Sequence, residues 1–153
     1  VPGDAADDAA EDVPAPLPPL HQEAVDAIER GDLAAAGAAY EKAMKQSPAD
    51  EEARLGLSQV RLMERTQAMD PAVVRQQAAD APTDVAAQIA AADLDLVGGH
   101  VEDAFARLID LVRVTSADER KTAREHLISL FDVIGAQDPR VSAARRALTN
   151  ALF

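Results

Sequence analysis

The sequence predicts an all-α fold, a right-handed solenoid of antiparallel helix pairs that ends in a C-terminal capping helix pair. Four-residue segments ending in aspartate recur every 34 residues, as SPAD at 47–50, APTD at 81–84 and TSAD at 115–118. Apolar residues follow helical spacing from Leu20 onward. Aromatic residues make up only 3% of the chain, so the helices must approach one another through small side chains, mostly alanine.

Residues 1–18 precede this helical pattern and have a different composition. They hold five acidic residues, no basic residue and four prolines. Such a segment cannot bury enough surface to offset its conformational entropy, so we expect a flexible linker. The chain begins with Val rather than Met. From both features we expect a piece of a longer protein with another domain upstream.

The first unit, residues 17–50, shows how each helix pair is built. Gly31 allows a tight turn between the two helices, and Gly99 repeats it two periods later. Ala36 and its counterpart Ala104 let the second helix lie close to the first, and Tyr40 on the same helix is expected to be a packing residue rather than a ligand contact. A period of about 34 residues, with a small residue early in the second helix and proline between units, is typical of tetratricopeptide repeats. The predicted domain spans 19–153.

The middle unit, 51–84, departs from the pattern, whereas the third unit, 85–118, keeps it. Arg65 stands where the turn glycine is expected, and Asp70-Pro71 falls inside the expected second helix. Aspartate at an N-cap followed by proline marks the start of a helix. We therefore predict a longer loop at about 65–70 and a short helix at about 71–79.

Residues 119–153 predict a fourth helix pair without the repeat's markers. An apolar stripe from Ala123 to Ile134 has helical spacing, and Gly135 ends it. Asp138-Pro139 starts the last helix. Solenoids need atypical end units to close the core, which is the structural role predicted for this pair.

The charge balance excludes several classes of partner. The chain carries 27 acidic against 15 basic residues, a formal charge of -12. This charge repels nucleic acid and anionic membrane surfaces and favours basic or mixed-charge partners. No apolar run is long enough to span a membrane. The chain has no cysteine, which excludes disulfides and thiolate chemistry and leaves the cytoplasm as the expected compartment.

No arrangement of residues predicts catalysis. The histidines His21, His100 and His126 lack metal-ligand spacing, and His100 occupies a turn position. Asp93 and Asp95 point roughly 200° apart on a helix, so they cannot share a substrate. Gly98-Gly99 is a helix-helix turn rather than a phosphate-binding loop. We therefore expect no catalytic, cofactor or metal site, and no enzyme.

The remaining use of a helical array is binding. The first helices of the units line its concave face, where the candidate groove residues gather. They are Leu55, Gln59, Leu62, Ile89 and Asp93. This groove is apolar with some acid, and it lacks the Lys and Asn with which related modules grip a C-terminal carboxylate. Two arrangements remain open: a groove filled by the C-terminal helix of the same chain, or a groove open to a peptide.

Two stretches carry a family resemblance, LDLVGGHVEDAFARLIDLV at 94–112 and REHLISLFDVIGAQDPRVSAARRALTNALF at 124–153. They resemble the C-terminal half of the thioredoxin-like co-chaperones CnoX and YbbN, in an actinobacterial form. The resemblance covers about 20–153, and the thioredoxin fold would attach upstream of the acidic linker. It implies an ATP-independent holdase that protects clients from aggregation or over-oxidation. Its implied partners are a GroEL-type chaperonin, the Hsp70 system and unfolded clients.

If that role carries over, residues 139–153 form the candidate partner-binding segment. Its basic cluster and apolar anchors are Arg140, Arg145, Arg146, Leu148, Leu152 and Phe153. The alternative for this segment is a capping helix with a buried apolar side and solvated arginines. Two other functions remain open: an adaptor that binds one protein or peptide in the concave groove, and a regulatory domain of a larger enzyme.

Overall fold

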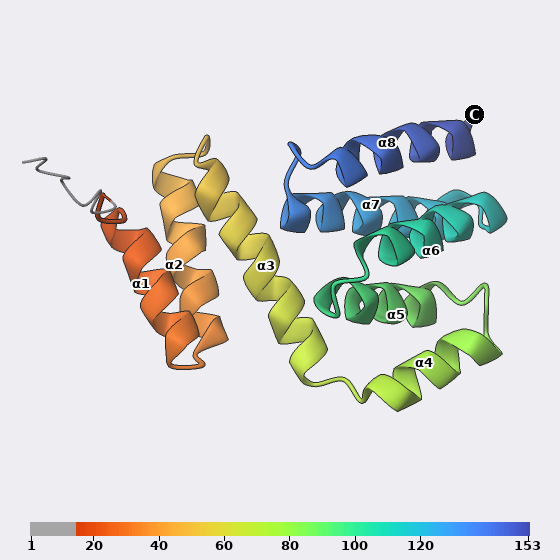
Figure 1. Ribbon diagram of the computed structural model, residues 1–153, viewed down its shortest axis with the longest axis horizontal. Helices are drawn as coiled ribbons and strands as arrows, with labels where there is room; N and C mark the ends of the chain where they lie inside the picture. The colour runs from red at the N-terminus through yellow and green to blue at the C-terminus, as the bar shows by residue number, and fades with distance from the viewer. Residues whose placement is uncertain (1–14) are drawn as a thin grey trace, which may run out of the picture.

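The computed structural model describes residues 15–153, in which every regular element is an α-helix. Figure 1 shows α5 to α8 stacked on the right of the view, with α1 to α3 on the left and α4 below the stack. Their bounds are α1 Pro19–Glu29, α2 Leu33–Gln46, α3 Glu51–Gln67, α4 Pro71–Asp80, α5 Val85–Val97, α6 Val101–Val114, α7 Ala117–Ile134 and α8 Pro139–Leu152. This confirms the predicted all-α fold of helix pairs. The linker predicted at 1–18 lies largely outside the described residues.

The repeated aspartates begin helices. Asp50 and Asp84, from the first two copies of the repeated segment, each accept a hydrogen bond from the backbone N–H three residues later, at 3.0 and 2.9 Å. Asp32, after the first turn, does the same at 3.0 Å. Each satisfies a donor that a helix start leaves without an intrahelical partner. The third copy of the marker differs, because α7 begins at Ala117 and its N-cap is Ser116. The helix therefore starts two residues before the predicted fourth pair.

The turns between helices explain how the regular units close. Gly31 and Gly99 have φ of 78° and 86°, the left-handed conformation that glycine adopts without strain. Ala36 and Ala104 are fully buried where α2 packs on α1 and α6 packs on α5. Their methyl groups allow the close approach that the sequence predicted.

The middle unit differs from the prediction. We expected a loop at about 65–70, but α3 continues to Gln67 and only residues 68–70 separate it from α4. α3 thus ends four residues later than its 34-residue counterpart α5, which adds one helical turn of about 6 Å. α4 packs on α5 instead of folding back on α3 (Figure 1). The predicted short helix at 71–79 is confirmed.

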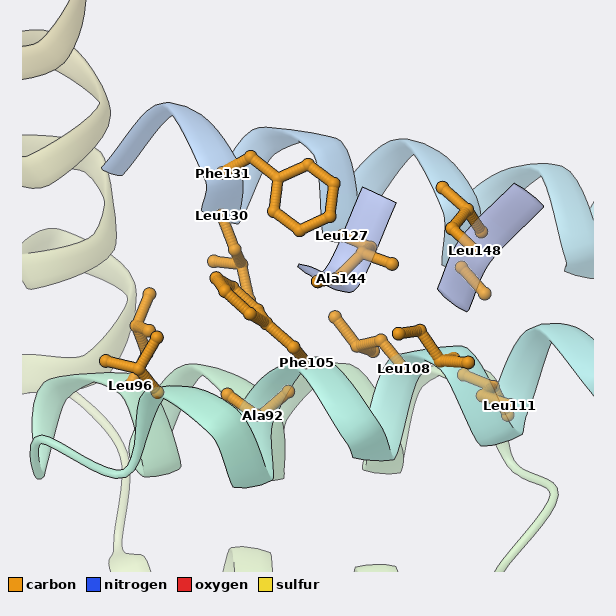
Figure 2. Packing of buried hydrophobic residues seen from close by; sticks show 14 of the residues in the cluster. Ala92, Leu96, Phe105, Leu108, Leu111, Leu127, Leu130, Phe131, Ala144 and Leu148 are labelled. Carbon is orange, nitrogen blue, oxygen red and sulfur yellow. The ribbon is translucent and has the colours of Figure 1, made fainter. Parts of the chain in front are cut away.

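The apolar core is divided between the two ends of the domain. One cluster joins α1, α2 and the first half of α3, where the Tyr40 ring packs against Gly56. The larger cluster joins α5 to α8 and reaches α3 through Leu62. Figure 2 shows its centre, where Phe105 and Phe131 meet edge to face with their ring centroids 5.0 Å apart. α3 therefore links the two clusters.

Candidate interaction surfaces

Of the candidate groove residues, Leu55 is half-buried on α3, and the other four lie where α3, α5 and α7 meet. Leu62 is buried in the larger core, and Ile89 packs against that core. Gln59 Nε2 donates a hydrogen bond to the Val133 carbonyl near the end of α7, at 3.3 Å. α7 packs against both α3 and α5. Neither arrangement that the sequence left open is found, because α7 rather than the C-terminal helix α8 packs against α3 and α5 where the groove was expected.

Asp93 is the buried polar centre of this contact. Arg65 Nε donates to its Oδ2 at 2.9 Å and Arg65 Nη2 to its Oδ1 at 3.2 Å. His126 Nε2 lies 2.7 Å from the same Oδ1. The carboxylate is 1% exposed, and its two partners come from α3 and α7. One side chain thus joins three helices.

The electrostatics of Asp93 favour its charged form. Burial alone raises the pKa of this carboxyl group, but the hydrogen bonds and charges of His126 and Arg65 outweigh burial and lower the pKa below its usual value. Neither partner could be anticipated from the sequence, because Arg65 and His126 are 28 and 33 residues away from Asp93. Spacing patterns within a helix carry no information on such pairs.

Asp95 faces a different side of α5. It accepts hydrogen bonds from Arg75 Nη1 at 2.8 Å and Arg107 Nε at 3.1 Å. Gln88 extends this network, because it accepts from Arg107 and donates to the Ala78 carbonyl. The helical angle between Asp93 and Asp95 therefore separates them as predicted. Both carboxylates connect helices.

The other sequence candidates for chemistry also have structural partners. His21 is buried, with its Nε2 2.6 Å from Asp50 Oδ2, and His100 is an exposed turn residue as predicted. Among residues 15–153, no group of three or more histidine or carboxylate side chains is arranged so that it could hold a metal ion. In the same part of the chain, every buried side-chain nitrogen or oxygen has a hydrogen-bond partner.

The candidate residues of α8 fall into two groups. Leu148 is buried in the larger core and Leu152 packs against it, so both stabilise the fold. Arg145 places its guanidinium carbon 5.0 Å from the centre of the Phe131 ring. Arg140, which is bonded twice to Asp138, is exposed, as is Arg146. Phe153 is fully exposed at the chain end.

Acid is expected to destabilise the domain through Asp93 and Asp50. The pKa of Asp50 is lowered, first by the Ala53 N–H and then by His21. In the unfolded chain these carboxyls bind protons near their ordinary pKa of about 4, whereas in the folded chain they bind protons only at lower pH. Their stabilisation is therefore complete above the unfolded pKa and is lost as pH falls through the folded pKa. The free energy of unfolding then falls by up to about 1.4 kcal/mol per pH unit for each carboxyl.

Urea unfolding followed by circular dichroism between about pH 2 and 6 measures this dependence. Asp93→Asn removes the Asp93 carboxyl while it keeps the side-chain size. Its free energy of unfolding is expected to fall less steeply with acid than that of the original chain. Equal slopes would show that Asp93 does not contribute.

Comparison with known proteins gives one family match and several relatives. A family model described as tetratricopeptide repeat matches residues 64–153. The chain is 39% identical over 126 residues to the uncharacterized protein Rv1324 of Mycobacterium tuberculosis (strain H37Rv) and to the uncharacterized protein Mb1359 of Mycobacterium bovis. Each alignment covers 82% of this chain but 41% of the relative, so the chain spans less than half of their length. No solved structure matches the chain.

None of the helices within residues 15–153 combines the length and the apolar character that a membrane span requires.

Proposed function

Because this chain belongs to the tetratricopeptide repeat family, we propose that it is the non-enzymatic protein-interaction domain of a thioredoxin-like co-chaperone and holdase. Family membership implies protein partners in general. The finer assignment rests on the resemblance of residues 94–112 and 124–153 to CnoX and YbbN. The relatives extend beyond the matched region, which leaves room for the thioredoxin-like domain in a full-length cytoplasmic protein.

The observation that carries the proposal is the composition and exposure of α8. This helix has three arginines and no acidic residue, on a chain of net charge -12. Arg146 and the terminal Phe153 are exposed. Arginine and aromatic side chains are enriched among the residues that contribute most to protein binding. The concave groove is the weaker candidate, because α7 already lies in it.

A test of this proposal must keep α8 in place. Deletion of residues 139–153 would remove Val141, Ala144 and Leu148 from the larger core and would unfold the C-terminal half. The double variant Arg146→Glu with Phe153→Ala changes only exposed side chains. Its thermal unfolding is expected to match that of the original chain.

The double variant is expected to bind a purified GroEL-type chaperonin at least about tenfold more weakly, as measured by biolayer interferometry. Lys42→Glu on α2 is the matched control, because it makes the same charge change at an exposed site on the other side of the domain. It should leave the affinity unchanged. Equal binding by the double variant and the original chain would refute the assignment of the site to α8.

A further inference from the structure

A second surface lies between α6 and α8, outside the concave groove. The two helices pack against each other, and a hollow of about 420 Å³ runs along their junction. Its lining residues are Glu102, Phe105, Ala106 and Ile109 of α6 and Pro139, Arg140, Ala143, Ala144 and Ala147 of α8. We call it the α6–α8 groove. Apolar side chains predominate in this lining.

The α6–α8 groove is open because its walls are alanines. Phe105 and Ile109 are buried and form its floor, while Ala106 and Ala143 are exposed along its sides. Ala143 and Ala147 are one turn apart on the same face of α8. Methyl groups are too short to fill the space between two helices. The groove therefore accepts large apolar side chains from another molecule, over a length of about 12 Å, or two helical turns.

The charges beside the groove indicate the character of its occupant. Arg146 follows Ala143 by three residues, so the two are neighbours on the surface of α8. Arg140 lines one end of the groove, next to Glu102. α8 has no acidic residue of its own. Asp138 and Glu102 already neutralise Arg140, so the cation along the α8 flank of the groove is Arg146, although the chain as a whole is acidic.

We propose that the α6–α8 groove binds an amphipathic helix of a protein partner, with large apolar residues on one face and acidic residues along the flank that faces α8. The apolar residues enter between the alanines, as in other helix-in-groove interactions. The acidic flank pairs with Arg146. The proposal rests on the assignment of the domain as a protein-interaction module, but not on a chaperonin as its partner.

The test uses two synthetic helical peptides of about 18 residues, with leucine at helical spacing and either glutamate or lysine on the flanks. Fluorescence anisotropy measures their affinity for the 153-residue chain. The glutamate peptide is expected to bind at least about tenfold more tightly. The net charge of -12 attracts the lysine peptide instead, so the expected preference is opposite in sign to non-specific attraction.

Filling the groove is expected to abolish this preference. Ala143→Phe places a ring between the walls and should weaken binding of the glutamate peptide at least about tenfold. Ala38→Phe, at an exposed alanine of α2, is the matched control and should have no effect. Thermal unfolding of both variants verifies that each is folded. Arg146→Glu should reverse the preference in favour of the lysine peptide.

Several results would overturn the proposal. These are a preference of the original chain for the lysine peptide, glutamate-peptide binding unaffected by Ala143→Phe, or no binding of either peptide up to about 1 mM. A dimer in sedimentation velocity that Ala143→Phe dissociates would instead identify a second copy of this chain as the occupant. Because no chaperonin is used, these outcomes are independent of the test of α8 as a chaperonin site.

Discussion

Replacement of Asp93 by alanine is expected to lower the free energy of unfolding by about 3 kcal/mol, because it leaves the Arg65 guanidinium without its buried counter-ion and the His126 ring without its hydrogen-bond partner. Arg65 and His126 both converge on this carboxylate, from α3 and α7. Without it, the Arg65 guanidinium and the His126 ring face each other where the two ends of the domain join. Chemical unfolding monitored by circular dichroism measures the loss.

Asp95→Ala is the matched control, two residues further along α5. Its partners Arg75 and Arg107 are 48% and 32% exposed, whereas the Asp93 partners Arg65 and His126 are 37% and 16% exposed. Water therefore replaces the hydrogen bonds lost at Asp95 more readily than the one between Asp93 and His126. Arg75 also comes from α4, which lies at the edge of the domain. We expect a loss of about 1.5 kcal/mol for this variant. Equal losses for Asp93→Ala and Asp95→Ala would contradict the central role of Asp93.

Gly56→Ala is expected to destabilise the N-terminal cluster by about 2 kcal/mol, although alanine is the better helix former by about 1 kcal/mol. A Cβ atom at position 56 would lie 2.5 Å from Cζ of Tyr40 and 2.8 Å from Cε1. The ring is buried between α2 and α3 and cannot move aside without strain. Steric overlap therefore outweighs the gain in helix propensity.

The Tyr40→Ala background reverses the sign of this effect. Tyr40→Ala alone costs about 3 kcal/mol, because it leaves a cavity in the N-terminal cluster. With the ring absent, only helix propensity remains, and Gly56→Ala should then stabilise the domain by up to about 1 kcal/mol. The resulting coupling between the two positions is measured with a double-mutant cycle. The same destabilisation in both backgrounds would exclude the contact with Tyr40 as its cause.

At the contact of Tyr40 with Gly56, the sequence predicted the role of one residue but not that of the other. Its position on the helical face of the first unit predicted a packing residue rather than a ligand contact, and the side chain is buried against Gly56. The apolar pattern did not predict the glycine's role, because Gly56 lies inside a helix where it is locally unfavourable. Only the ring across the helix interface explains why a glycine stands there.

The α8 candidates show the same division. Helical spacing placed Leu148 and Phe153 together as apolar anchors, but the first is buried and the second is fully exposed. A sequence pattern identifies apolar residues on a helix, but it does not say which of them the neighbouring helix covers. The α6–α8 groove was not predicted at all, since an alanine-rich helix surface looks alike whether it borders a hollow or open solvent.

The sequence by itself determined the eight helices of residues 15–153, their 34-residue repetition and most of their ends. These depend on local signals, such as the Asp84 cap or the Gly99 turn, that act within a few residues. Tertiary structure alone decided that α4 leaves α3 for α5, that α7 fills the concave groove, and that Asp93 meets Arg65 and His126. One additional turn in α3 changes where the next helix can pack. Contacts between residues about 30 positions apart depend on how whole helices pack against one another, and no local sequence pattern encodes that packing.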